Sequence, residues 1–222
     1  MHRRLGPFQE NTIVVGDSLD IMPQMPDGCV DLVITDPPYE EQYSHLWLPL
    51  GQQGQRLMKT GASLVTLCGH YQIPFVIKQL SKSLRYWWIG GMYHKGNLNR
   101  FPGKWVCVTW KPALWYVKER RRYKDYECPI DLLACDHKEK DYHKWGQPAS
   151  WFRHWIERLS NEGDLIFDPC IGSGTTAVVA DRLGRKFFGC DINPDYVEMA
   201  LERLEEDRSR RSNAQSVGNT LE

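Results

Sequence analysis

The sequence has no excess of charge of either sign and no long apolar segment. It carries 28 basic and 28 acidic residues, so its formal net charge is zero with histidine neutral. No uncharged apolar run approaches the ~18 residues that a membrane span needs, and the first residues lack the apolar stretch of a signal peptide. We therefore expect no membrane partner and a cytoplasmic location.

Closely spaced cysteines are also missing. The seven cysteines are odd in number and are spread through the chain without a C-x-x-C pair. This spacing excludes a dense disulfide framework and favours reduced thiols. Cys128, Cys135, His137 and His143 lie near one another in the sequence, but their spacing matches no common zinc site. We therefore expect no metal.

The overall composition is that of one globular domain. The chain has 222 residues, of which 41% are hydrophobic and 25% are charged, and this length and balance predict a single domain over residues 1–222. Residues 209–222 are polar and show no periodicity, so we expect a disordered tail there.

Charge is balanced overall but not locally. Between Lys82 and Lys124 there are eleven basic residues and one acid, Glu119, which gives this segment a net charge of +10. Ten aromatic residues are interleaved with these charges. The mixture suits a nucleic acid, because cations neutralise phosphates and exposed rings stack on bases. A solvated basic surface over a tryptophan-rich core explains the same composition.

Apolar segments alternate with amphipathic ones along the chain, which predicts an α/β fold with a mainly parallel sheet and helices on both faces. Strands are expected at Thr12–Val15, Val30–Thr35, Ala62–Cys68, Trp87–Tyr93, Leu165–Phe167 and Lys186–Cys190. Helices are expected at Ser18–Met25, Tyr43–Lys59, Ile73–Leu84, Ala149–Leu159, Thr176–Leu183 and Pro194–Asp207. Residues 94–142 are predicted to form a small basic insertion, with Val106–Trp110 and Leu114–Val117 as a hairpin around Lys111-Pro112-Ala113.

A glycine-bearing turn, residues 168–176, follows the predicted strand Leu165–Phe167. Asp191 stands at the end of the next predicted strand, nineteen residues after Gly172, so the turn and this acid belong to one βαβ unit. In such a unit the glycines let the backbone approach a ligand, and an acid about twenty residues later accepts hydrogen bonds from a ribose. The turn lacks the lysine of a P-loop and the third glycine of a dinucleotide site, so it favours a nucleoside without pyrophosphate.

A second turn, Asp36-Pro37-Pro38-Tyr39, follows the predicted strand Val30–Thr35. Open α/β sheets place their binding sites at this end of the strands. Proline has no N–H to donate, so the turn presents carbonyls, one carboxylate and one aromatic ring. This acceptor-rich group suits a flat ring that carries an amino group. A rigid turn without a binding role is the alternative.

The two turns in this order resemble the S-adenosylmethionine-dependent amino methyltransferases of DNA, in the permuted arrangement with the catalytic motif first. Gly16-Asp17-Ser18, residues 143–148 and residues 191–196 also resemble family positions; Cys170 departs from the family, which often has Phe there. The resemblance implies a Rossmann-like methyltransferase fold, S-adenosylmethionine as cofactor and double-stranded DNA as partner, in a prokaryotic or phage-encoded protein.

The resemblance also implies roles for individual residues. A target base flipped out of the duplex would stack on Tyr39 and donate its amine hydrogens to the Asp36 carboxylate and the Pro37 carbonyl. The residues implied in this catalytic turn are Asp36, Pro37, Pro38 and Tyr39. Those implied at the cofactor are Asp168, Cys170, Gly172, Ser173, Gly174 and Thr175 along the loop, Asp191 at the ribose, Ile192 and Asp17 at the adenine, and His143, Gln147 and Pro148 at the methionine end.

Residues 94–142 are the expected target-recognition insertion. The residues expected to contact DNA are Lys95, Arg120, Arg121, Arg122 and Lys124. About fifty residues are few for reading a target, so we expect either a short recognition sequence or a second subunit, as in a homodimer, that helps to read it. Asp36 at the first motif position favours adenine N6 as the methylated atom. Cytosine N4 methylation, or a DNA-binding subunit without turnover, are the alternatives.

Overall fold

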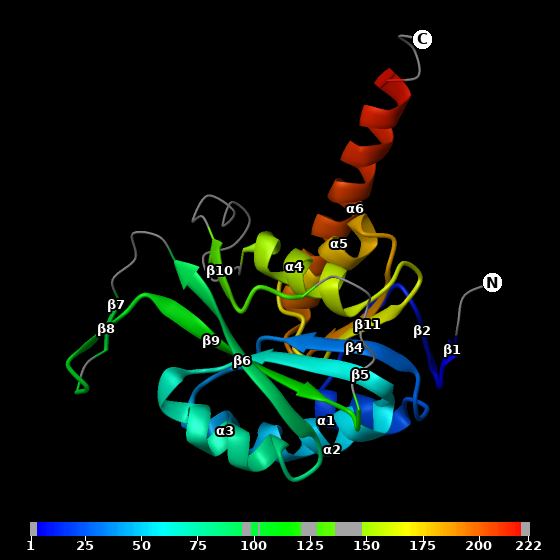
Figure 1. Ribbon diagram of the computed structural model, residues 1–222. Helices are drawn as coiled ribbons and strands as arrows, with labels where there is room; N and C mark the ends of the chain where they lie inside the picture. Colours follow the sequence, from blue (N-terminus) through cyan, green and yellow to red (C-terminus); the bar gives the residue numbers. More distant parts are fainter. Residues whose placement is uncertain (1–3, 95–98, 102, 121–127, 136–147, 219–222) are drawn as a thin grey trace.

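An eight-stranded sheet forms the centre of the computed structural model (Figure 1), which describes residues 4–94, 99–101, 103–120, 128–135 and 148–218. The strand order is β10-β6-β9-β5-β4-β11-β12-β3. β9 is antiparallel to its neighbours β5 and β6, whereas every other pair in this sheet is parallel. The predicted α/β class with a mainly parallel sheet is confirmed.

The strands of this sheet are β3 (Thr12–Val15), β4 (Val30–Thr35), β5 (Met58–Leu67), β6 (Arg85–His94), β9 (Trp110–Val117), β10 (Leu132–Cys135), β11 (Leu165–Asp168) and β12 (Lys186–Asp191). Two further pairs are β1 (Arg4–Leu5) with β2 (Phe8–Gln9), and β7 (Asn99–Phe101) with β8 (Val106–Val108). The helices are α1 (Ser18–Ile21), α2 (Trp47–Leu57), α3 (Ile73–Leu80), α4 (Ala149–Leu159), α5 (Thr175–Arg182) and α6 (Pro194–Gly218), with 3-10 turns η1 (Met22–Gln24), η2 (Glu41–Leu46) and η3 (His70–Gln72). In the part of the chain that is described, no helix combines the length and the apolarity that crossing a bilayer requires.

Both faces of the sheet are buried under helices. In β4, Leu32 and Ile34 belong to the core that α4, α5 and α6 cover, whereas Val30 and Val33 belong to the core under α1, α2 and α3. Figure 1 shows the two helical layers above and below the sheet. This alternation explains why the central strands are apolar almost without interruption, since successive side chains point to opposite faces.

The order in which strands are added to the sheet reverses between the neighbouring strands β4 and β11. The chain passes from β4 to β5 through α2 on one face, and from β11 to β12 through α5 on the other face, moving outward in opposite directions. The connections after β4 and β11 therefore diverge at the carboxyl ends of the two strands, which is where open α/β sheets bind ligands. Asp36 and Pro169 are the first residues beyond these ends.

The predicted hairpin around Lys111-Pro112-Ala113 is wrong. These residues lie inside the continuous strand β9, and β8 pairs with β7 instead. Proline is disfavoured in a central strand because it cannot donate to the ladder. Here the last pair between β5 and β9 is Leu67 with Ala113, and Pro112 uses its carbonyl to accept a hydrogen bond from Cys68 N at 3.1 Å. Pro112 thus lies where β5 has already ended.

The expected disorder from residue 209 onward is also wrong as far as Gly218, because α6 continues to that residue and projects beyond the body of the molecule (Figure 1). Residues 219–222 lie outside the described part. Arg208 and Arg211 of α6 both form ion pairs with Asp181 of α5, the first at 2.6 Å. These tertiary contacts stabilise a polar segment that periodicity alone did not identify as a helix.

We predict that Asp181→Asn loosens the end of α6. Burial acts to raise the pKa of Asp181, but the two arginines outweigh it and the pKa is lowered, so the carboxylate form is the one they stabilise. We expect a loss of about 1 kcal/mol in urea unfolding and faster hydrogen exchange over residues 209–214. Glu206→Gln breaks the exposed pair with Arg210 and is the control; equal exchange in both variants would contradict the prediction.

Candidate active site

The turn Asp36-Pro37-Pro38-Tyr39 is held in place by the segment that follows β5. The Tyr39 carbonyl accepts hydrogen bonds from Tyr71 Oη at 2.7 Å and from Gln72 Nε2 at 2.5 Å. The Tyr39 ring packs against the core beneath α4, α5 and α6. The turn therefore has a defined conformation although it has no helical or strand hydrogen bonds of its own.

Lys111 lies between the two functional side chains of this turn. Its Nζ is 3.0 Å from Asp36 Oδ1, 2.9 Å from Asp36 Oδ2 and 4.5 Å from the centre of the Tyr39 ring. The side chains of Lys111 and Asp36 are 17% and 20% exposed. Sequence reasoning missed this residue, because it counted Lys111 only as one of many basic residues and placed it in a hairpin turn.

The glycine loop combines a tight helix contact with open space. Gly174 has φ +80° and precedes α5, and a Cβ there would lie 2.7 Å from Ala200 Cβ of α6. Gly172 has φ +50°, but a Cβ at this position would meet nothing within 4 Å. Arg203 of α6 donates to the Ser173 carbonyl at 3.2 Å and to Thr175 Oγ1 at 2.9 Å. Contacts with α6 thus support the loop at Ser173, Gly174 and Thr175, whereas the space next to Gly172 is open.

Asp168 supports this loop from beneath. Its side chain is buried and accepts hydrogen bonds from Cys170 N at 3.1 Å and from Thr176 Oγ1 at 2.6 Å. Burial raises the pKa of Asp168 to about 7, although both hydrogen bonds act in the opposite direction. Cys170, the departure from the family pattern, is partly exposed in the loop.

Asp191 closes the other side of the loop. Its carboxylate accepts hydrogen bonds from Gly172 N at 2.9 Å and from Asn193 N at 3.0 Å. The next residue, Ile192, is 69% exposed. Asp17 lies after β3, the strand that pairs with β12, and its carboxylate caps α1. The structure therefore gathers Asp17, Asp191, Ile192 and the glycine loop at one edge of the sheet.

The structure does not describe all of the predicted site residues. His143, Gln147, Lys95, Arg121, Arg122 and Lys124 lie outside the described residues. Pro148 is buried immediately before α4. Arg120 is exposed, but it follows the end of β9 at the sheet edge opposite to Asp36. At about 3.3 Å per residue, the length of β9 puts roughly 25 Å between its two ends.

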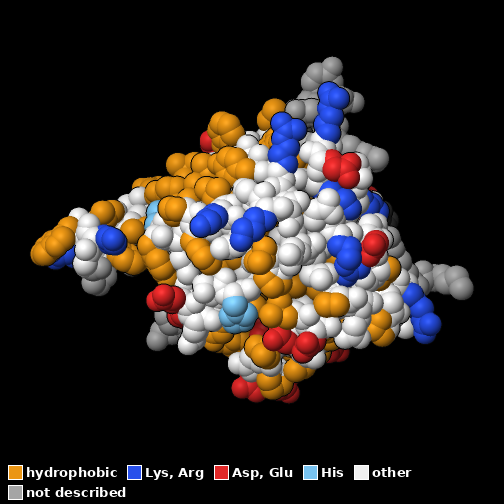
Figure 2. Space-filling model, turned by 90° about the horizontal axis from the view of Figure 1, so that it is seen from below, with side chains coloured by type: hydrophobic (Ala, Val, Ile, Leu, Met, Phe, Trp, Pro, Cys, Tyr) orange, Lys and Arg blue, Asp and Glu red, His pale blue; other side chains and the backbone are white. Residues whose placement is uncertain are grey.

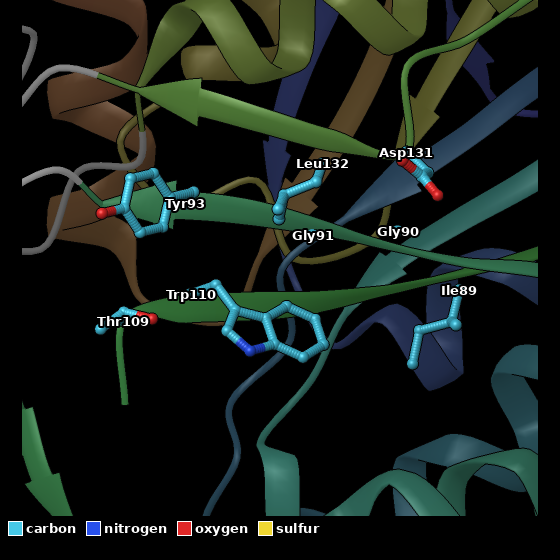
Figure 3. A pocket seen from close by; sticks show the side chains of 8 residues that line it. All are labelled: Ile89, Gly90, Gly91, Tyr93, Thr109, Trp110, Asp131 and Leu132. Carbon is cyan, nitrogen blue, oxygen red and sulfur yellow. The ribbon is translucent and has the colours of Figure 1, made fainter. Parts of the chain in front are cut away.

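A separate pocket of about 360 Å³ opens over β6, β9 and β10 (Figure 3). Trp110, Tyr93 and Leu132 contribute to its walls. Trp110 precedes Lys111 in β9, and neighbouring residues of a strand point to opposite faces. The pocket is therefore on the other face of the sheet from the pair of Lys111 with Asp36.

Several solved structures share this fold. The complex of M1.HpyAVI with SAM has a TM-score of 0.73 and 22% identity, and the match covers 87% of this chain and 98% of that one. The PvuII DNA methyltransferase, which is cytosine-N4-specific, has a TM-score of 0.75 and 19% identity, over 89% of this chain and 91% of that one. The fold, together with the two turns at its edge, defines a methyltransferase that uses S-adenosylmethionine.

The chain belongs to the N6-adenine and N4-cytosine DNA methylase family, whose model matches residues 30–202. It is 24% identical to the type II methyltransferase M.HpaI of Haemophilus parainfluenzae, over 88% of this chain and 74% of that protein. It is 25% identical to the DNA adenine methyltransferase YhdJ of Escherichia coli (strain K12), over 89% of this chain and 83% of that protein. The protein is thus a DNA methyltransferase of this family.

The residues at the edge fit S-adenosylmethionine. The open space at Gly172 lets a ligand approach the loop backbone. Exposed apolar side chains next to a carboxylate, as in Ile192 and Asp191, suit a purine ring with its ribose hydroxyls. When bound there, the cofactor supplies an electrophilic methyl group.

We predict that Asp168 makes the free energy of unfolding fall as pH rises. Its folded pKa of about 7 lies above the ordinary value of 3.8, so the folded state holds the proton more tightly. The associated stability is fully present below about pH 4 and is lost as pH rises through 7. At about 1.4 kcal/mol per pKa unit, the loss reaches roughly 4 kcal/mol. In urea titrations from pH 5 to 8, Asp168→Asn should have a flatter profile than the wild type; parallel profiles would disprove this.

Proposed function

We propose that this enzyme methylates the exocyclic N6 amine of an adenine that has been flipped out of double-stranded DNA. The observation that carries the proposal is the turn after β4, which offers the Asp36 carboxylate, the Pro37 carbonyl and the Tyr39 ring beside the glycine loop. The amine of a paired base cannot reach such a site, so the base must leave the stack at a cost of a few kcal/mol.

The turn orients the amine by accepting both of its hydrogens. One N–H is donated to Asp36 and the other to the Pro37 carbonyl, which directs the nitrogen lone pair toward the methyl carbon. S-adenosylmethionine, held by the glycine loop and Asp191, would supply the methyl group; the nitrogen would take it up with its lone pair, and sulfur would keep the electron pair of the broken carbon–sulfur bond. Asp36 stabilises the positive charge that develops on nitrogen. A proton then leaves the nitrogen for solvent.

Adenine is favoured over cytosine by Asp36 at the first motif position, and the relative YhdJ is named as an adenine enzyme. Cytosine N4 is the second candidate, because the PvuII enzyme shares the fold and is cytosine-N4-specific. Both bases present an exocyclic amine, so the same turn serves either one.

We predict that Asp36→Asn lowers kcat by about 100-fold or more, because a neutral amide no longer stabilises the charge on nitrogen. Nucleoside mass spectrometry of DNA from a methylation-deficient host should show N6-methyladenine with the wild type and not with Asp36→Ala. Asp27→Asn, at an exposed carboxylate, is the matched control. N4-methylcytosine would establish the second candidate. Retained cofactor binding without either product would identify a DNA-binding subunit.

Within the insertion, we propose that the β7–β8 hairpin contacts DNA. Phe101 of β7 lies against Tyr71, with 5.7 Å between ring centres, and Tyr71 binds the Tyr39 carbonyl. Trp105 is 83% exposed with φ +52°, and the Arg100 guanidinium is 4.6 Å from the centre of its ring. Figure 2 shows this hairpin projecting at the left, with apolar and basic side chains together. Stacking rings and cations suit bases and phosphates.

We predict that Trp105→Ala and Arg100→Ala each weaken duplex binding by about tenfold. Arg100→Ala should also lower the salt slope of log K by about one, since one phosphate contact is lost. Fluorescence anisotropy at several salt concentrations measures both quantities. Arg120→Ala tests the alternative from the sequence, that the run from Lys118 to Lys124 contacts phosphate; a larger effect there than at the hairpin would reject the hairpin as the main contact.

We further propose that the enzyme acts in a prokaryotic cytoplasm, which its bacterial relatives support. The homodimer stays a prediction that rests on the shortness of the insertion; sedimentation velocity with and without DNA would test it.

A further inference from the structure

The Lys111 ammonium makes two of the three contacts that the proposed mechanism assigns to the target base. It donates to both oxygens of Asp36, at 3.0 and 2.9 Å, and it lies 4.5 Å from the centre of the Tyr39 ring. A nitrogen that carries hydrogens thus already occupies the carboxylate of the turn. A flipped base with its amine on Asp36 and its ring on Tyr39 would need the same volume.

The positive charge of Lys111 is also unfavourable for the reaction. Methyl transfer makes the amine nitrogen positive, and Asp36 stabilises that charge only if the carboxylate is free to interact with it. An ammonium held within 3.0 Å of the same carboxylate would repel the developing charge. Lys111 cannot therefore keep its position during methyl transfer.

The side chain is able to leave without disturbing the strand. Trp110, the preceding residue, contacts the His70 ring edge-on with 4.9 Å between ring centres, and Lys111 itself is paired with Met92 of β6. The backbone at Lys111 is thus fixed, whereas its four-carbon side chain has rotatable bonds and is 17% exposed.

We propose that Lys111 is a displaceable surrogate for the target amine: its ammonium occupies the amine position in the free enzyme and leaves Asp36 when the target base enters. This inference rests on the proposed function, but it holds for adenine and cytosine alike. It makes Lys111 a residue that sets the apparent affinity for the target, because only the fraction of enzyme with a vacated turn binds the flipped base.

The test compares Lys111→Met and Lys111→Arg in steady-state methylation of DNA from a methylation-deficient host, with saturating S-adenosylmethionine. Lys111→Met removes the ammonium and leaves an uncharged, slightly shorter and flexible side chain. Nothing then holds this side chain on the Asp36 carboxylate, so the KM for DNA should fall by about fivefold with kcat undiminished. Lys111→Arg forms a stronger bidentate pair with a carboxylate, so its KM should rise. General attraction to DNA predicts the contrary order, with a raised KM for Lys111→Met and an unchanged KM for Lys111→Arg.

Lys78→Met, at an exposed side chain of α3, is the control; its KM and kcat should match those of the wild type. A fall in kcat for Lys111→Met at unchanged KM would overturn the inference and make Lys111 a positioning residue for Asp36. An unchanged KM and kcat would overturn it as well.

Failure of the proposed function can be distinguished from failure of the Lys111 inference, because in the first case the wild type would methylate neither adenine nor cytosine. In that event calorimetric titration with 9-methyladenine and 1-methylcytosine tests the inference without turnover. Tighter binding of either base to Lys111→Met than to the wild type supports the surrogate role, and equal or weaker binding overturns it.

Discussion

The candidate active site, where Asp36 and the glycine loop follow the carboxyl ends of their strands, depends on the pairing of β4 with β11. These two strands are far apart in the sequence. The Asp31 carboxylate of β4 joins three strands: it accepts a hydrogen bond from Leu165 N of β11 at 3.0 Å and pairs with Lys59 Nζ of β5 at 2.5 Å. A slip of one residue would turn every side chain of a strand to the opposite face. Register at this amino end therefore determines whether Asp36 and the glycine loop meet at the carboxyl end.

The second constraint is the reversal of β9. In a sheet whose other strands are parallel, functional residues are expected after strands, because those ends meet at one edge. β9 runs the other way, so its beginning lies at that edge and its end lies at the opposite one. The reversal brings Lys111 to Asp36 and takes Arg120 away from it. The same basic segment thus supplies one residue to the site and places another on the far side.

The sequence allowed the parallel core and the two functional turns to be predicted, because both depend on local signals. The apolar run of β4 and the alternation of strands with helices reflect burial on both faces. Asp36 and Asp191 were found because each directly follows such a strand. Lys111 could not be found in this way. Pro112 beside it is a turn signal when read locally, and only the end of β5 at Leu67 explains why a strand tolerates it. The end of α6 was missed for a related reason, since ion pairs with Asp181 have no periodicity along the chain.

An acceptor-rich turn poses an electrostatic problem whenever no substrate is present. A carboxylate that is 20% exposed is partly desolvated, and a nearby cation relieves that cost. The cation must also be removable. Solvent-exposed ion pairs contribute about 0–1 kcal/mol, and a cation over an aromatic ring at an exposed site adds about 0.5–1 kcal/mol. These values are smaller than the few kcal/mol that base flipping already costs. A fully buried pair, by contrast, costs about 3–5 kcal/mol to break. The partial exposure of Lys111 and Asp36 therefore gives a pair strong enough to occupy the empty turn and weak enough to yield to a base.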